Sequence, residues 1–453
     1  MATNKPGKAR VAGSGVAESG GSGRSPRYRV YWHGPLHRKG GLGGASKAYA
    51  RALRRQGIPV RASSSRKVKR PIAADRGKRV LVYHYPPHTM NPARAKGLGY
   101  NKVVLNTVWE TTRIPARWRQ AMNRYDAVLV PSRHNLRAMQ DSGVKVPVYV
   151  APHGVNTRAY RPSNPPARLP GGRGRFVFLS VFGFQHRKNP EALLRAYWEE
   201  FTEADNVLLV IKTNGCGPGE DGTWIRSRIS RYRASLSIPH RTAPLLLLTR
   251  HLDSRELKGL YTAAHAFVLP TRGEGVGMPF MEAMASGIPA VATAWGGQMD
   301  FLTPSNAFLV PYRLERPAVS MGKRSAISRS FREIFAEKDQ LWAEADLGML
   351  KMQMRRAYAN PSLCREKGRL ARRDMKALGW KAAGRAMASA LDRVAAGAVS
   401  RREAPLADGT ARKRQARKKT AVPNAVRAGR DRAGEPAQHR RPWMGSRFRQ
   451  SPR

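Results

Sequence analysis

Residues 272–289 read RGEGVGMPFMEAMASGIP, and this stretch decides the fold prediction. Apolar segments at 265–270 and 289–293 flank it and predict two strands. Between them the pattern predicts a glycine loop and a short helix, with Pro279 at the first helical position and Gly287 at the end. A strand, a loop, a helix and a second strand in this order form the unit of a parallel α/β sheet.

Two carboxylates stand in this stretch, Glu274 in the predicted loop and Glu282 one turn inside the predicted helix. A glycine loop that opens a helix presents backbone N–H groups to an anionic or hydroxyl-rich ligand. Carboxylates accept hydrogen bonds from paired hydroxyl groups, as in the binding of sugars and ribose. We therefore expect Glu274 to be exposed in the loop and both carboxylates to face one crevice.

The same alternation of strand and helix patterns runs through most of the chain and predicts a parallel sheet in each half. A cluster of proline and glycine at 161–172 can continue neither a helix nor a central strand, so it predicts an interdomain linker. The predicted strands cover residues 29–33, 79–84, 102–106, 126–130 and 146–150 in the first half, and 176–181, 206–212, 244–249 and 265–270 in the second.

The two ends of the chain differ in composition from its body. They are polar, basic and rich in small residues or in proline and glycine, which predicts disorder. The predicted organisation is a tail at 1–27, a first domain at 28–160, a linker at 161–174, a second domain at 175–325, helices at 326–397 and a second tail at 398–453.

The chain of 453 residues carries a formal net charge of +53. Residues 1–29 hold six Lys or Arg and one acidic residue, and residues 401–453 hold sixteen and four, so most of the positive charge lies between these ends. Such a surface attracts polyanions, which makes nucleic acid, an anionic membrane surface and lipid-linked acceptors candidate partners.

The cysteine count and the apolar runs indicate where in the cell the protein is located. Only Cys216 and Cys364 occur, which excludes a disulfide framework and favours a reducing cytoplasm. The apolar runs are too short to span a bilayer, and the N-terminus has no apolar segment of signal-peptide length. We therefore expect a cytoplasmic protein, with peripheral contact at the inner face of the membrane as the form of association that its charge allows.

The quoted stretch resembles the signature of retaining GT-B glycosyltransferases of family 4, in which two glutamates are separated by seven residues. The resemblance covers residues 29–395 and is strongest from 176 to 312. It implies two Rossmann-like domains that face each other across a cleft. It also implies transfer of a sugar from a nucleotide diphosphate sugar with retention at the anomeric carbon. The residues that carry the resemblance are Glu274, the GVG at 275–277, Pro279, Glu282, Ala283, Met284 and the Gly-Ile-Pro at 287–289.

The resemblance also implies the catalytic residues Glu274, Lys188 and Arg187. Family members carry an arginine just after a strand glycine and a lysine a few residues later; here Phe184 stands at the arginine position and Lys188 matches the lysine. Arg187 is assigned as the second cation because it lies next to Lys188. Glu274 would hold donor-sugar hydroxyls, and the two cations would offset charge on the leaving diphosphate.

Further residues are assigned to the two substrates. Glu110, in a Trp-Glu-Thr segment after a predicted strand, is placed on the acceptor side, where a glycan or lipid-linked glycan is expected. Glu282 is assigned to the ribose of the donor. The other residues assigned to the donor are Gly43 and Gly44 of the glycine run at 40–44, Lys212 at the end of a predicted strand, and Gly275, Val276, Gly277 and Met278 of the loop.

The sequence has no Asp-x-Asp pair, no spacing of His and Cys for zinc and no Walker A motif, so we expect an enzyme without a metal or other cofactor. The alternative function is a nucleic-acid-associated protein or a DNA-modifying glycosyltransferase on the same scaffold, which the basic tails support. A sugar-phosphate phosphorylase or synthase of the same fold is a third interpretation. No helix-turn-helix and no aromatic-plus-basic motif is apparent, which favours a glycosyltransferase.

Overall fold

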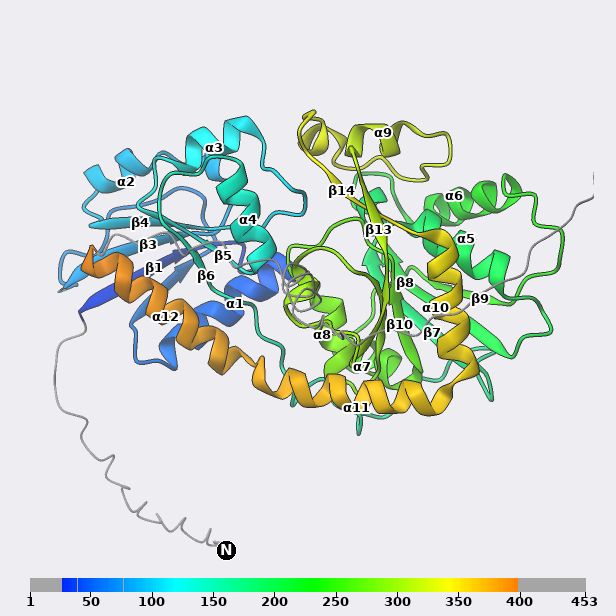
Figure 1. Ribbon diagram of the computed structural model, residues 1–453. Helices are drawn as coiled ribbons and strands as arrows, with labels where there is room; N and C mark the ends of the chain where they lie inside the picture. Colours follow the sequence, from blue (N-terminus) through cyan, green and yellow to red (C-terminus); the bar gives the residue numbers. More distant parts are fainter. Residues whose placement is uncertain (1–26, 39, 76, 398–453) are drawn as a thin grey trace, which may run out of the picture. The chain divides into compact units, whose positions relative to one another are not determined.

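The computed structural model describes residues 27–38, 40–75 and 77–397. The predicted tails at 1–27 and 398–453 therefore lie outside the described residues, apart from Arg27. The described part contains two six-stranded sheets and one two-stranded sheet, with helices packed around them (Figure 1). The prediction of an α/β fold with a parallel sheet in each half is confirmed.

The first sheet has the strand order β2-β1-β3-β4-β5-β6, and every neighbouring pair is parallel. Its strands are β1 (Tyr28–His33), β2 (Val60–Ser63), β3 (Lys78–Tyr83), β4 (Lys102–Asn106), β5 (Ala127–Val130) and β6 (Val148–Val150). The crossovers contain α1 (Gly41–Arg54), α2 (Pro92–Gly97), α3 (Ala116–Met122) and α4 (Arg133–Asp141).

Both faces of the first sheet are buried, because side chains of a strand alternate between faces. Val80 and Val82 of β3 pack in one core cluster with α1, whereas Leu81 and Tyr83 pack in another with α3. The sequence of β3 is therefore a continuous apolar run rather than an alternating one, as in other strands that are buried on both faces.

The second sheet has the order β12-β11-β10-β7-β8-β9 and is also parallel throughout. Its strands are β7 (Phe176–Gly183), β8 (Val207–Asn214), β9 (Leu245–Leu248), β10 (Ala266–Leu269), β11 (Ala290–Thr293) and β12 (Ala307–Val310). The crossovers contain α5 (Pro190–Glu200), α6 (Gly222–Ala234), α7 (Ser254–Ala263) and α8 (Met278–Ala285).

Beyond the second sheet the chain makes an excursion that the sequence did not predict. The range 326–397 was expected to be helical, but β14 (Trp342–Ala345) lies within it and pairs antiparallel with β13 (Tyr312–Glu315). Between these strands lie α9 (Pro317–Gly322) and the short helix η4 (Arg332–Phe335). The excursion completes the core on one face of the first sheet, to which it contributes Met321, Phe335 and Trp342.

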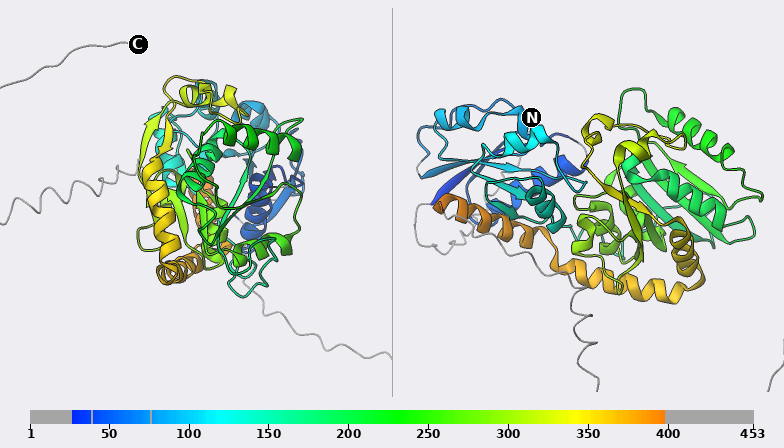
Figure 2. Two further views of the ribbon diagram at one scale, coloured as in Figure 1. Left: turned by 90° about the vertical axis from the view of Figure 1, so that its right-hand side faces the viewer. Right: turned by 45° about the horizontal axis from the view of Figure 1, so that its top comes forward.

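The last three helices divide between the two sheets. Helices α10 (Leu347–Ala359) and α11 (Pro361–Ala377) pack beside the second sheet, and α12 (Trp380–Ala396) returns to the first (Figure 2). Met387 and Leu391 of α12 are fully buried in the first core. Helix α12 crosses α1 so closely that a Cβ on Gly384 would lie 2.9 Å from the Cβ of Ala52.

Two connections join the sheets, and they are bonded to each other. The first runs from β6 to β7 over residues 151–175, and the second joins α11 to α12 at 378–379. The N–H of Val155 donates to the carbonyl of Leu378 at 2.9 Å. Arg372 of α11 donates to the carbonyls of Thr157 and Tyr160, each at 2.9 Å.

Candidate active site

The loop between β10 and α8 holds the predicted motif. Helix α8 begins at Met278 after Gly277, whose φ of 86° favours glycine, and it ends before Gly287, whose φ is 84°. Pro279 is thus the second helical residue, one position later than predicted. The predicted end at Gly287 agrees with the structure.

The two glycines that flank Glu274 allow the loop to touch the first sheet. A Cβ on Gly273 would overlap the carbonyl of Glu110, and a Cβ on Gly275 would overlap the side chain of Val108. The loop therefore needs glycine here for close approach to the segment after β4. It is held there by Ser132, whose hydroxyl donates to the carbonyl of Gly275 at 2.7 Å.

Glu274 forms a buried ion pair with Lys188, which lies after β7 in the short helix η2 (His186–Lys188). Glu274 is 5% exposed and Lys188 is 8% exposed. The expectation of an exposed Glu274 is therefore wrong, because residues 108–110 cover the loop. The parallel sheet explains the pairing, since β7 and β10 are neighbours and their carboxyl ends meet at one edge.

Arg187 joins this pair to the first sheet. Its guanidinium lies 3.7 Å from the Glu274 carboxylate and 3.5 Å from the Glu110 carboxylate, and it also donates to the carbonyl of Gly273. Arg187, Lys188, Glu274 and Glu110 are called the site cluster below. The structure thus brings together the three predicted catalytic residues and the predicted acceptor-side residue.

The site cluster holds Glu274 in its ionised form. Burial alone would raise the pKa of the Glu274 carboxyl, but the adjacent Lys188 and Arg187 hold that pKa below its usual value. A buried charge of this kind is stable only while it keeps a partner of opposite sign. Any ligand that takes the cations must therefore give Glu274 other hydrogen-bond donors.

Phe184 stands where the resembled family has an arginine, and its side chain is fully buried. Its ring packs edge-to-face on Trp224 of α6, with 5.9 Å between the ring centroids. This position therefore serves the core. Arg187 supplies a cation at the same edge of the sheet.

A second charge cluster lies beside the first and was not predicted from the sequence. Arg272 is 4% exposed and lies 3.2 Å from the carboxylate of Glu191 and 2.7 Å from that of Glu344. Glu191 also bonds His186 at 2.7 Å. Arg272, Glu191, Glu344 and His186 are called the supporting cluster.

The supporting cluster holds in place the backbone of the two loops that follow β7 and β10. Arg272 donates to the carbonyl of His186, and the N–H of Arg272 donates to the carbonyl of Arg187 at 2.8 Å. Although burial opposes ionisation, His186 and Arg272 lower the pKa of Glu191 to about 2. The only sequence feature that pointed to the supporting cluster was Arg272, two residues before Glu274.

Glu282 lies apart from the site cluster in its described contacts. Tyr261 of α7 donates to its carboxylate at 2.8 Å, and Tyr160 of the first connection lies against Tyr261 with 5.7 Å between the ring centroids. Burial raises the pKa of Glu282 to about 7. The structure therefore places the two motif carboxylates in different surroundings. The role of Glu282 at the ribose stays a prediction.

Gly43 and Gly44 belong to the first turn of α1, which begins at Gly41. A Cβ on Gly43 would overlap the carbonyl of Arg38, so glycine is required there by the chain's own loop. Gly44 has open space at its Cβ position. Donor binding by either glycine stays a prediction.

The remaining assigned residues occupy the same edge of the second sheet. Val276 is buried and Met278 is half-buried at the start of α8. Lys212 lies in β8, and its ammonium group donates to the carbonyl of Thr213 at 3.1 Å. Burial, followed by repulsion from Arg250, lowers the pKa of Lys212. No described contact joins Lys212 to the site cluster.

Within residues 27–38, 40–75 and 77–397, no three His, Cys, Asp or Glu side chains gather in a metal-binding group. In the same part of the chain no helix is long and apolar enough to cross a membrane. Metal independence stays a prediction.

The second domain, which holds most of the site cluster, matches a known protein family. Residues 173–318 match the family described as glycosyl transferases group 1. The matched segment contains Arg187, Lys188 and Glu274, whereas Glu110 precedes it. This segment of the second domain is therefore similar to group 1 glycosyl transferases.

Curated relatives match parts of the chain. A D-inositol 3-phosphate glycosyltransferase from Corynebacterium diphtheriae is 38% identical over 125 residues, which are 27% of this chain and 27% of the relative. One from Frankia alni is 33% identical over 153 residues, 33% of this chain and 36% of the relative. An alpha-monoglucosyldiacylglycerol synthase from Streptococcus pneumoniae is 26% identical over 182 residues, 38% of each chain. The chain thus spans roughly a third of the length of these relatives.

Solved structures establish the GT-B fold. A sucrose-phosphate synthase from Thermosynechococcus elongatus has a TM-score of 0.59 at 16% identity, over 82% of this chain and 100% of that chain. A UDP-forming alpha,alpha-trehalose-phosphate synthase from Burkholderia vietnamiensis has a TM-score of 0.54 at 15% identity, over 80% of this chain and 79% of that chain. At these identities the similarity concerns the fold.

Proposed function

We propose that the protein is a retaining, metal-independent glycosyltransferase that moves a sugar from a nucleotide diphosphate sugar to a hydroxyl group of an acceptor. The site cluster carries this proposal, because two cations and a carboxylate meet at the carboxyl edge of a domain that is similar to group 1 glycosyl transferases. Ligands of parallel α/β sheets bind at this edge.

Lys188 and Arg187 are proposed to bind the donor diphosphate. As the bond from the sugar to the diphosphate lengthens, negative charge builds on the phosphate oxygens, and positioned cations stabilise it. In the structure both cations pair with Glu274. The diphosphate would replace Glu274 as their partner, so the ion pair keeps the cations in place before the donor binds.

Glu274 is proposed to accept hydrogen bonds from hydroxyls of the donor sugar. This role gives the carboxylate the donors that it loses when the diphosphate takes the cations. Retention fits a reaction in which the acceptor attacks on the face that the diphosphate leaves, with a phosphate oxygen taking the acceptor proton. No side chain of this chain is assigned as a nucleophile.

Glu110 is proposed to lie on the acceptor side, because it follows β4 of the first sheet and reaches Arg187 across from it. The names of the relatives point to two acceptor classes, a phosphorylated polyol or sugar and a diacylglycerol lipid. The first class adds to the glycan or lipid-linked glycan predicted from the sequence.

A two-stage experiment tests the function. Wild-type protein is screened by thermal shift against UDP-, GDP- and ADP-sugars, because a ligand that binds the native state raises its stability. The donor that raises Tm is then offered with inositol phosphate, hexose phosphates and diacylglycerol vesicles, and product anomers are determined by NMR. Inversion of the anomeric carbon would contradict the proposed mechanism, and absence of transfer with every donor that binds would contradict the function.

The basic tails give no further support to this choice. Their predicted contacts with anionic membranes or nucleic acid fall outside the described residues and stay predictions.

A further inference from the structure

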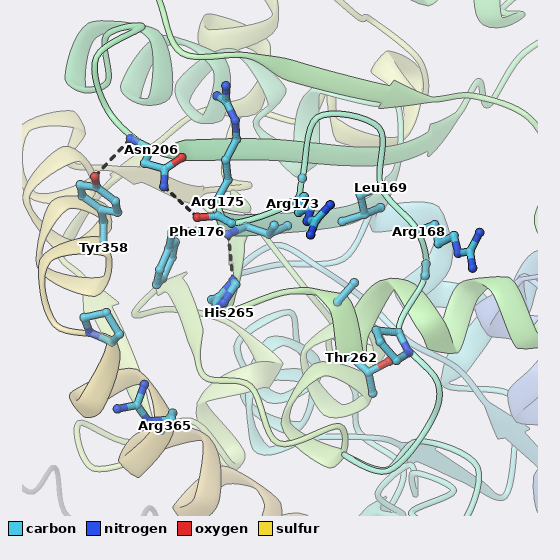
Figure 3. A pocket seen from close by; sticks show the side chains of 17 residues that line it. Arg168, Leu169, Arg173, Arg175, Phe176, Asn206, Thr262, His265, Tyr358 and Arg365 are labelled. Carbon is cyan, nitrogen blue, oxygen red and sulfur yellow. Dashed lines mark hydrogen bonds between the residues drawn. The ribbon is translucent and has the colours of Figure 1, made fainter.

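A cavity of about 780 Å³ lies at the amino-terminal edge of the second sheet (Figure 3). Phe176 begins β7, Asn206 precedes β8 and His265 precedes β10, and all three line it. The site cluster follows the opposite ends of β7 and β10. The cavity is therefore separate from the proposed donor site.

The formally charged side chains that line the cavity are all positive. Four arginines line it, and among its described lining residues there is no Asp or Glu. Arg175 donates to the carbonyl of Val207 at 3.2 Å, whereas Arg168, Arg173 and Arg365 are exposed. Like charges that share a cavity repel one another, so an anion that binds between them is stabilised.

The floor of the cavity is aromatic and has a fixed hydrogen-bond donor. His265 stacks on Phe176 with 4.9 Å between the ring centroids. The N–H of Val177 donates to Nδ1 of His265 at 2.9 Å, so the proton of the neutral imidazole is on Nε2. Figure 3 shows Arg173 and Arg365 on either side of His265.

The lining comes from the first connection between the sheets and from α11. Arg168 and Arg173 belong to the segment from β6 to β7, and Arg365 belongs to α11, which leads to α12. Arg372 of α11 already bonds the first connection through the carbonyls of Thr157 and Tyr160. An anion that contacts both Arg173 and Arg365 would add a further link between the first connection and α11.

We infer that this cavity is a second binding site, for a phosphorylated small molecule. Guanidinium groups recognise phosphate through paired hydrogen bonds, and the His265 Nε2–H adds a neutral donor. The volume falls in the range of small-molecule sites, which is about 300–1,000 Å³. The site is independent of the proposed function, since none of its residues belongs to the site cluster.

Inorganic pyrophosphate serves as the probe, measured by calorimetry at physiological salt. The test variant is R173Q/R365Q, and the matched control is R324Q/R385Q, which removes two exposed arginines outside the cavity. A third variant, K188Q, reports on the donor site. We expect R173Q/R365Q to weaken one binding event by about tenfold or more, because each charge-assisted contact contributes substantially to affinity. The control should match wild type, and K188Q should retain that event.

Two outcomes would overturn the inference. One is an isotherm of R173Q/R365Q that superimposes on that of the control. The other is loss of all pyrophosphate binding in K188Q, which would place the only site at the site cluster. Flotation with phosphatidylglycerol vesicles separates free phosphates from lipid headgroups. Equal flotation of both double variants supports a soluble ligand, and selective loss in R173Q/R365Q with unchanged pyrophosphate affinity contradicts it.

Discussion

Two neighbouring loops of the second domain, residues 186–191 and 271–274, build two charge clusters of different character. In the supporting cluster, Arg272 is held by two carboxylates and a carbonyl, and Glu191 by a histidine, an arginine and the N–H of Ile327. In the site cluster the charges pair mainly with one another, and the Arg187 and Glu110 side chains remain 11% and 21% exposed. The first cluster has its bonds supplied by the fold, whereas the second can exchange them for those of a ligand.

This difference separates residues that are adjacent in sequence. Arg272 and Glu274 are two positions apart, yet one orders the loops and the other faces the proposed substrate. Loss of a supporting residue should therefore reduce stability, and loss of a site residue should reduce activity.

The largest effect is expected for Glu274→Gln, which should lower the transfer rate by about 10³-fold or more, as for loss of a polar group that contacts the reacting centre. Initial rates at saturating donor measure it, with the exposed Glu366→Gln as control. Because Lys188 also loses its buried partner, Tm should fall as well. A rate within twofold of wild type would remove Glu274 from the site.

Arg272→Met should lower the free energy of unfolding by about 3–5 kcal/mol, because it leaves Glu191 charged and buried without its guanidinium. Urea unfolding measures the loss, and Arg324→Met, an exposed change of the same type, is the control. If the two variants are equally stable, the supporting cluster does not stabilise the fold and the comparison fails.

Lys188→Ala should weaken binding of the nucleoside diphosphate by about 1.5–3 kcal/mol, the usual contribution of a charged hydrogen bond. Lys212→Ala, at the same edge of the sheet, is the comparison, and its loss of diphosphate affinity should be smaller because no described contact joins Lys212 to the site cluster. Calorimetry measures the affinity of both variants for the nucleoside diphosphate. Equal losses in both variants would extend the site to β8.

Glu191 and Glu282 should make the stability of the protein depend on pH in opposite directions. The pKa of Glu191 is lowered from 4.5 to about 2, so its contribution is complete above pH 4.5 and is lost as the pH falls toward 2. The pKa of Glu282 is raised from 4.5 to about 7, so stability is lost as the pH rises between these values. Glu282→Gln should therefore lose less Tm than wild type between pH 5 and pH 8. Parallel Tm curves would contradict the raised pKa.

The smallest effect is expected from EDTA, which should leave the transfer rate unchanged, because Lys188 and Arg187 supply the positive charge at the diphosphate. Rates with EDTA, and with Mn²⁺ or Mg²⁺ added back, measure it. Inhibition that these ions reverse would mean that the site cluster lacks a charge that the reaction needs.

The sequence predicted the parts of the site that depend on local pattern and sheet topology. Lys188 and Glu274 are far apart in the chain, but both follow apolar strands, and parallel topology places such positions at one edge. The end of α8 just before Gly287 followed from helix-ending signals in the same way.

Other features depend on contacts between distant segments and could not be predicted. The burial of Glu274 results from residues 108–110, which approach the loop only because Gly273 and Gly275 lack side chains. Glu344 reaches Arg272 because β14 pairs with β13, and neither strand was predicted. β14 reads Trp-Ala-Glu-Ala, a short pattern that does not separate strand from helix.

The return of α12 to the first sheet has a consequence for the order of folding. During synthesis the strands of the first domain are made before the second domain, but one face of their core lacks Met387 and Leu391 until α12 has been made. The second domain has all its strands and helices by Ala377, before α12 is made. We therefore expect the second domain to become protease-resistant on the ribosome before the first. A chain that ends at residue 378 and has been released from the ribosome should be cleaved within residues 27–150 and spared within 176–377.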